Sequence, residues 1–134
     1  MKTYWDTSAL LAVIIAEPTA LAAFNDNTHN RVTRTHSLSE TFGQLTGGRM
    51  VLRMTPQDAA AALRALARKI EFLELDAKDV LEALSETRKH GVMGRMVHDY
   101  LHVYAAERAK AGRIFTFNVS DFEYLTDLPV TPPQ

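Results

Sequence analysis

Residues 2–15 read KTYWDTSALLAVII and combine the sequence signals of a strand, a turn and a helix. Its first part is short, aromatic and β-prone, whereas an uninterrupted apolar run begins at Ala9. Between them, Asp6 and the two hydroxyl residues after it stand where a helix cap is expected. We therefore predict a strand, a turn and a helix. Because open parallel sheets bind ligands at the carboxyl ends of their strands, Asp6 occupies a position suited to chemistry.

The alternation of strand and helix continues along the chain. Further strands are expected over residues 31–35, 72–75 and 113–117, with a short edge near 128–130, and helical patterns separate them. Ser37 or Ser39 is expected to cap the helix that ends at Gly47 and Gly48. Strands separated by helices predict an α/β sandwich with a mainly parallel sheet. A length of 134 residues fits a single domain over 1–134.

The amino-acid composition limits which metal ligands and binding partners the chain can use. With 46% hydrophobic and 23% charged residues, the chain is neither disordered nor fibrous. It has no cysteine, so a metal must be held by oxygen or imidazole. The apolar start contains Asp6 and lacks a cleavage site, so we expect neither a signal peptide nor a membrane span, and a cytoplasmic location. A net charge of -1 gives no general attraction to a polyanion, so nucleic-acid binding would need a local basic patch or metal ions.

Several acids are expected at one edge of the sheet. Asp6 follows one strand, Asn118 and Asp121 follow another, and Glu40 and Asp99 fall near the starts of helices. Convergent carboxylates repel one another, so a structure that gathers them usually employs a cation. Oxygen ligands suit Mg²⁺ or Mn²⁺, and such ions activate water for phosphodiester hydrolysis.

The same segments resemble the successive acidic motifs of PIN domains, in the same order. They are YWDTSALL at 4–11, LSET at 38–41, HDYL at 98–101 and TFNVSDF at 116–122. The resemblance covers essentially the whole chain. It is greatest to the VapC-type toxins of bacterial toxin–antitoxin modules, which are compact ribonucleases inhibited by a small partner protein.

This resemblance implies a three-layer sandwich and a site. Asp6, Glu40 and Asp99 match the acids that bind Mg²⁺ or Mn²⁺, and Asp121 is expected to act with them. Asn118 stands at a position that holds Asp or Asn in the family, which leaves open whether Asn118 or Asp121 supports a second metal. Supporting roles are implied for the hydroxyl residues Thr7, Ser8 and Thr116. The family further implies cleavage of RNA that leaves a 5′-phosphate, a homodimer, and a cognate antitoxin that occupies the groove.

Other interpretations stay open beside this one. Each acid alone also fits an ordinary helix cap or a partner of the helix dipole. His98 and His102 have the spacing of a paired metal site, but the Glu of a zinc motif is missing and zinc ligation is disfavoured; either histidine is also a candidate for contact with RNA or a partner. Scattered basic residues fit either a phosphate-contacting patch or a solvated face; they are Arg31, Arg34, Arg49, Arg53, Arg64, Arg68 and Lys69.

The same residues bear on two alternative functions, a phosphatase and a non-catalytic binding module. A phosphatase of the haloacid-dehalogenase kind needs a second Asp at position 8, which is Ser8. The alternative from another class is a PIN-like module that has lost catalysis and binds RNA or protein. The presence of Asp6, Glu40 and Asp99 disfavours that alternative, whereas the neutral Asn118 favours it.

Overall fold

A five-stranded sheet forms the centre of the computed structural model, which describes residues 1–47 and 53–134. Its strand order is β3-β2-β1-β4-β5, and every neighbouring pair is parallel. The strands are β1 (Thr3–Trp5), β2 (Arg31–Arg34), β3 (Glu71–Leu73), β4 (Arg113–Phe115) and β5 (Val130–Thr131). The expectation of a mainly parallel sheet is confirmed.

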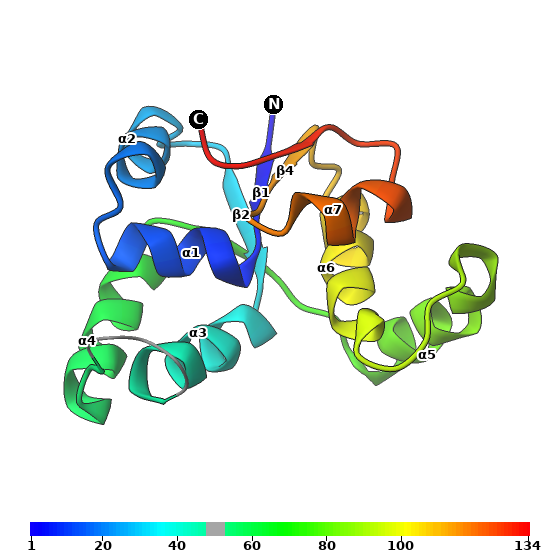
Figure 1. The fold of residues 1–134 in the computed structure, drawn as a ribbon, viewed down its shortest axis with the longest axis horizontal. Coiled ribbons are helices and arrows are strands. Elements are labelled where there is room, and N and C mark those ends of the chain that lie inside the picture. Colours follow the sequence, from blue (N-terminus) through cyan, green and yellow to red (C-terminus); the bar gives the residue numbers. More distant parts are fainter. Residues whose placement is uncertain (48–52) are drawn as a thin grey trace.

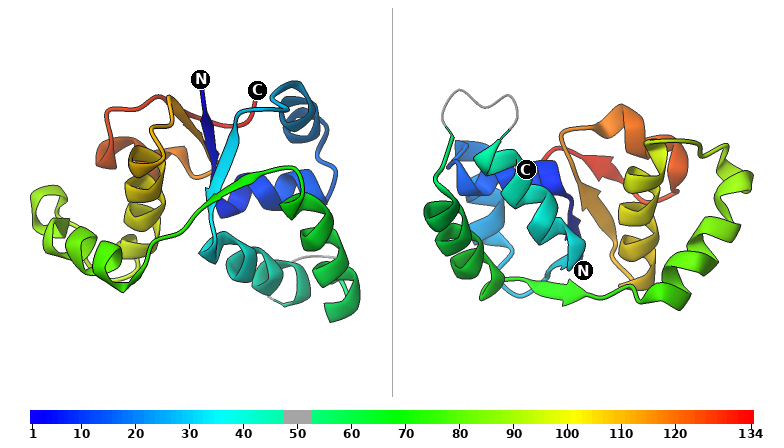
Figure 2. Two further views of the ribbon diagram at one scale, coloured as in Figure 1. Left: turned by 180° about the vertical axis from the view of Figure 1, so that it is seen from behind. Right: turned by 90° about the horizontal axis from the view of Figure 1, so that it is seen from below.

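Helices cover both faces of the sheet, as Figures 1 and 2 show. One face carries α1 (Thr7–Ile14), α2 (Pro18–Asp26), α3 (His36–Thr46) and α4 (Pro56–Ala67). The other carries α5 (Ala77–Ser85), α6 (Met96–Arg108) and α7 (Val119–Phe122). The expected three layers are therefore present.

The two apolar cores follow from the pleat of the central strand. Trp5 and Phe115 pack with α1, α2, α3 and α4, whereas Tyr4 and Ile114 pack with α5, α6 and α7. Successive side chains of a strand point to opposite faces, so neighbours in sequence enter different cores. Both faces of β1 are thus buried, and Asp6 follows directly at its carboxyl end.

Two helix starts are capped by side chains, the first of them as predicted. The Asp6 side chain accepts a hydrogen bond from the backbone N–H of Ala9 and so caps α1. The Thr55 side chain accepts from the N–H of Asp58 at the start of α4. Such caps satisfy the N–H groups that the first helical turn leaves without partners.

The predicted cap of α3 is wrong. The helix begins at His36, directly after β2, so Ser37 and Ser39 lie inside its first turn. Ser37 accepts a hydrogen bond from the Thr33 hydroxyl, and Ser39 donates to the carbonyl oxygen of His36. Thr35, at the actual cap position, makes no side-chain cap bond.

Three helices end at or before a glycine. α5 ends at Ser85, and a short 3-10 turn over Thr87–His90 leads to Gly91, whose φ of 65° ends it. α6 ends at Arg108, ahead of Gly112. α3 ends at Thr46, beside Gly47, as expected; Gly48 lies outside the described residues.

Across residues 1–47 and 53–134, no single helix is long and apolar enough to cross a membrane. α1 and α2 reach that length and hydropathy together, with a bend of 102° between them.

Candidate functional site

One cleft of about 420 Å³ opens at the carboxyl ends of β1 and β4. Side chains or backbone from α1, α3, α6 and the loop after β4 line it: Asp6, Thr7, Ser8, Leu11, Glu40, Gln44, Asp99, His102 and Asn118. Three of the four predicted acids therefore meet there although they are far apart in sequence. The parallel sheet and the helix starts bring them together.

Asp6 lies at the floor of the cleft, with only 2% of its surface exposed. Its Oδ1 atom accepts hydrogen bonds from the Ser8 hydroxyl at 2.7 Å and the Ala9 N–H at 2.9 Å. Its Oδ2 atom accepts from the Thr116 hydroxyl at 2.5 Å. Burial raises the pKa of the Asp6 carboxyl, while the charge of His102 and these hydrogen bonds oppose the rise.

The hydroxyls around Asp6 also tie two strands together. Ser8 Oγ accepts from the backbone N–H of Phe117 at 2.9 Å and lies 3.3 Å from Thr116 Oγ1. Thr116 Oγ1 in turn accepts from the N–H of Asn118 at 3.0 Å. The loop after β4 is thereby fixed to the turn after β1, so Asp6 and Asn118 keep a defined relative position.

Glu40 is oriented by two neighbours through the same oxygen. Its Oε1 atom accepts from the Thr7 hydroxyl at 3.2 Å and lies 3.1 Å from His102 Nε2. Burial alone would raise the pKa of the Glu40 carboxyl, but the hydrogen bond and charge of His102, aided by His36 and Thr7, lower it below its ordinary value. Oε2 receives no hydrogen bond from the part of the chain that the structure describes.

His102 is a site residue that the sequence analysis did not assign. It is 3% exposed, and its Nδ1 atom lies 2.7 Å from the Tyr4 hydroxyl. His98, its predicted companion, is exposed at the start of α6. The i, i+4 spacing of His98 and His102 is typical of a zinc site. In the structure, however, the partners of His102 are the Tyr4 hydroxyl of β1 and the Glu40 carboxylate of α3.

Asp99 stands in the first turn of α6, half-buried. Burial raises the pKa of its carboxyl, His102 opposes this, and Asp121, Asp6 and Glu40 raise it further. No hydrogen bond or ion pair reaches the Asp99 carboxylate from any described residue. Asp99 thus lies beside other acids without a direct hydrogen-bond or ion-pair partner among the described residues, and only the charge of His102 opposes their repulsion.

The structure distinguishes Asn118 from Asp121 by their positions relative to the cleft. Asn118 lines the cleft, and its side chain does not cap α7. Asp121, one turn further along α7, is exposed and does not line the cleft, although its charge acts on Asp99. Asn118 is therefore placed for direct contact with a ligand, and Asp121 acts at longer range.

The donor set suits a hard divalent cation. Three carboxylates, an amide and hydroxyls face one cleft, and a cation would offset the repulsion that raises the pKa of Asp99. Within residues 1–47 and 53–134, no three acidic or histidine side chains are already close enough together to hold an ion. The residues thus fit Mg²⁺ or Mn²⁺ in chemical type.

The basic residues that the structure describes lie in different environments. Arg31 is structural: its Nε donates to the carbonyl of Phe24 and its Nη1 to that of Lys69, both at 2.7 Å. Arg64, Arg68 and Lys69 are exposed on or after α4. Arg49 lies outside the described residues.

A parallel α/β sandwich with carboxylates at the carboxyl ends of its strands defines the class of the protein. The model of the PIN domain matches residues 3–126, and the chain therefore belongs to the PIN domain family. No curated protein sequence matches it.

Solved structures share this fold. VapBC from Salmonella typhimurium bound to DNA contains a chain with a TM-score of 0.73 and 19% identity, over 97% of this chain and 96% of that one. VapBC2 from Rickettsia felis, bound to a promoter DNA fragment, gives a TM-score of 0.71 and 17% identity, with 97% of each chain covered. VapC20 from Mycobacterium tuberculosis, described as a sarcin-ricin loop cleaving toxin, gives a TM-score of 0.70 and 17% identity over 90% and 92%. These likenesses confirm the expected PIN-like fold.

Proposed function

We propose that this PIN-domain protein is a metal-dependent ribonuclease, and that it is the toxin of a toxin–antitoxin pair. The observation that carries the proposal is the single cleft in which Asp6, Glu40 and Asp99 meet. Structural neighbours include a toxin described as cleaving the sarcin-ricin loop, which supports RNA as the substrate class.

Asp6, Glu40 and Asp99 would hold Mg²⁺ or Mn²⁺, with Asn118 as a neutral oxygen ligand. Glu40 can offer Oε2, because Oε1 already accepts from Thr7 and contacts His102. When bound, the cation supplies an activated water and neutralises charge on the scissile phosphate and the leaving oxygen.

The remaining site residues position these acids. Ser8 and Thr116 fix the Asp6 carboxylate from two sides through their hydroxyls. His102 and Thr7 fix Glu40, and Tyr4 fixes His102 from the sheet. Outer partners of this kind orient the groups that bind a metal and tune their affinity. Asp121 adds negative charge that favours the bound cation.

Partners of the proposed toxin follow from the neighbouring structures. Two of them are VapBC assemblies bound to DNA, which supports a cognate antitoxin as the partner of this chain. The family resemblance further supports a homodimer, and we propose that the protein acts in the cytoplasm.

The test measures cleavage of host RNA and metal binding together. Wild-type protein should cut RNA with Mg²⁺ or Mn²⁺ and lose activity in excess chelator, and Asp6→Asn and Asp99→Asn should both abolish cutting. Cleavage that persists in either variant, or in chelator, would contradict the proposal. Mn²⁺ binding without any RNA cleavage would instead support the binding-module alternative.

A further inference from the structure

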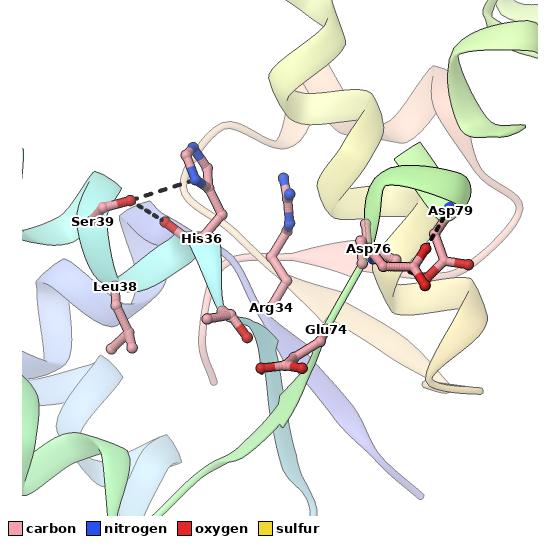
Figure 3. A pocket seen from close by; sticks show the side chains of 9 residues that line it. Arg34, His36, Leu38, Ser39, Glu74, Asp76 and Asp79 are labelled. Atoms are coloured by element: carbon pink, nitrogen blue, oxygen red, sulfur yellow. Dashed lines mark hydrogen bonds between the residues drawn. The ribbon is translucent and has the colours of Figure 1, made fainter. Parts of the chain in front are cut away.

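A second and larger cleft, of about 720 Å³, adjoins the carboxylate site (Figure 3). It lies between the end of β2 with the start of α3 and the connection from β3 to α5; its lining is Arg34, Thr35, His36, Leu38, Ser39, Glu74, Leu75, Asp76 and Asp79. Ser39 of this cleft directly precedes Glu40 of the first, so α3 borders both.

Arg34 is the unusual residue of this second cleft. It is 8% exposed, yet no hydrogen bond or ion pair links its guanidinium to any described residue. Figure 3 shows the side chain extending into the space between His36 and the start of α5. Arg31, on the same strand, has both of its carbonyl partners. The guanidinium nitrogens are not fully buried, so the charged end of this largely buried side chain opens into the cleft and is available to an external anion.

The start of α3 offers further positive potential to the same cleft. Thr35 provides no side-chain cap, so the first N–H groups of this 11-residue helix are not satisfied by a side chain. His36, exposed in the first turn, extends toward the same side as Arg34 in Figure 3. A guanidinium, an imidazole and a helix start together match the oxygens of a phosphate.

The acids of the cleft do not neutralise Arg34. Asp76 accepts from the N–H of Asp79 at 2.8 Å, and Asp79 accepts from the N–H of Asp76 and from Arg108, both at 3.1 Å. Glu74 is exposed and forms no ion pair with Arg34. The open groups at the α3 side of the cleft are therefore the basic ones.

We propose that Arg34, His36 and the start of α3 form a subsite for a backbone phosphate of the RNA substrate, next to the phosphate that is cut. This proposal rests on the proposed ribonuclease function. RNA is favoured because α3 borders both clefts, so a strand whose scissile phosphate lay among Asp6, Glu40 and Asp99 would pass along α3 into this cleft. The charge of His36 already reaches Glu40 and that of Arg34 reaches Tyr4, which supports their proximity to the site.

The kinetic test compares Arg34→Gln with Arg68→Gln on single-stranded RNA. Arg68 makes the same charge change but stands before β3, at the opposite end of the sheet, and is exposed. Arg34→Gln should raise KM about tenfold with little change in kcat, because one charged hydrogen-bonding contact is lost. The slope of log KM against log salt should fall by about 0.7, the value for one phosphate on a single strand. Arg34→Lys should restore part of the affinity, and Arg68→Gln should resemble the wild type.

A binding test does not depend on cleavage. Inorganic phosphate should shift the amide NMR signals of His36 and Ser37 in the wild-type protein but not in Arg34→Gln, and a 2′-O-methyl RNA strand should displace it. RNA cleavage that is unaffected by Arg34→Gln would overturn the subsite and leave the nuclease intact. Phosphate and RNA binding through Arg34 in a protein that cuts no RNA would support the subsite and reject the nuclease. Displacement of phosphate by an acidic peptide and not by RNA would overturn the proposal in favour of a protein partner.

Discussion

His102 Nε2 lies 3.1 Å from Glu40 Oε1, and the opposite ring nitrogen of His102 lies 2.7 Å from the Tyr4 hydroxyl. A central strand, α6 and α3 are thereby joined through one buried imidazole. The orientation of Glu40 therefore depends on a residue that does not itself need to touch the substrate.

Replacing His102 should weaken the site through Glu40. His102→Phe keeps a ring but removes both contacts, and we expect about a 10- to 100-fold loss in Mn²⁺ affinity or cleavage, as for other outer partners of metal sites. His102→Gln retains a donor toward Glu40 and should lose less. Calorimetric Mn²⁺ titration together with RNA cleavage rates measures both.

Tyr4→Phe is the matched control for this chain of contacts. It removes the hydroxyl that faces His102 Nδ1 and leaves the contact between His102 and Glu40 in place. Its effect should be smaller than that of His102→Phe. Equal Mn²⁺ affinity in all three variants and the wild type would show that His102 does not position Glu40.

The parts of this fold that depend on neighbours in sequence were predictable. Asp6 caps the helix that follows it, and the central strands lie where their apolar residues indicated. The role of His102 was not predictable, because its partners Tyr4 and Glu40 are 98 and 62 residues away. Likewise, Asn118 and Asp121 could be distinguished only once the orientation of the short α7 was known.

Asp99→Asn should stabilise the protein without metal and destabilise it relative to the wild type with metal. Asp99 is a half-buried carboxylate near three other acids and has no hydrogen-bond partner among the described residues. Removing its charge should raise the unfolding free energy by up to about 1 kcal/mol at neutral pH, or a few degrees in Tm. Added Mn²⁺ should raise the Tm of the wild type far more than that of the variant. A wild-type Tm insensitive to Mn²⁺ would contradict the assignment of Asp99.

Asp99 and Glu40 should make the stability of the metal-free protein depend on pH in opposite directions. The pKa of Asp99 is raised in the folded state, so its stabilising protonated form is present below the unfolded value of 3.8 and is lost as pH rises through the folded pKa. The pKa of Glu40 is lowered, so its contribution is present above 4.5 and is lost as pH falls through the folded pKa. The advantage of Asp99→Asn over the wild type should therefore shrink on acidification, which urea unfolding at several pH values would show. An advantage that is constant with pH would exclude the charge of Asp99 as its cause.

Asn118→Ala should lower Mn²⁺ affinity more than Asp121→Asn. Asn118 lines the cleft, whereas Asp121 is exposed outside it and acts through charge alone. Asn118→Asp should raise Mn²⁺ affinity, because it adds a carboxylate ligand to a site for a hard cation. Titration of the three variants at two salt concentrations would separate a direct ligand from a screened distant charge. A larger and salt-insensitive loss in Asp121→Asn would reverse the assignment.

Replacement of Arg31 should destabilise the fold far more than replacement of Arg34, although both residues are buried on β2. The Arg31 guanidinium donates to two backbone carbonyls and stacks on Phe24, with its centre 3.9 Å from the ring centroid. Arg31→Met leaves the carbonyl oxygens of Phe24 and Lys69 without these hydrogen-bond donors, and we expect a loss of about 3 kcal/mol in unfolding free energy. Arg34→Met removes a buried cation that has no partner in the described structure, so stability should change by less than about 1 kcal/mol or should increase. Urea denaturation midpoints of the two variants provide the comparison. A strongly destabilised Arg34→Met protein would mean that the Arg34 guanidinium stabilises the fold. A destabilised Arg31→Met protein whose RNA binding keeps the wild-type salt dependence would mean that Arg31 has a structural role only.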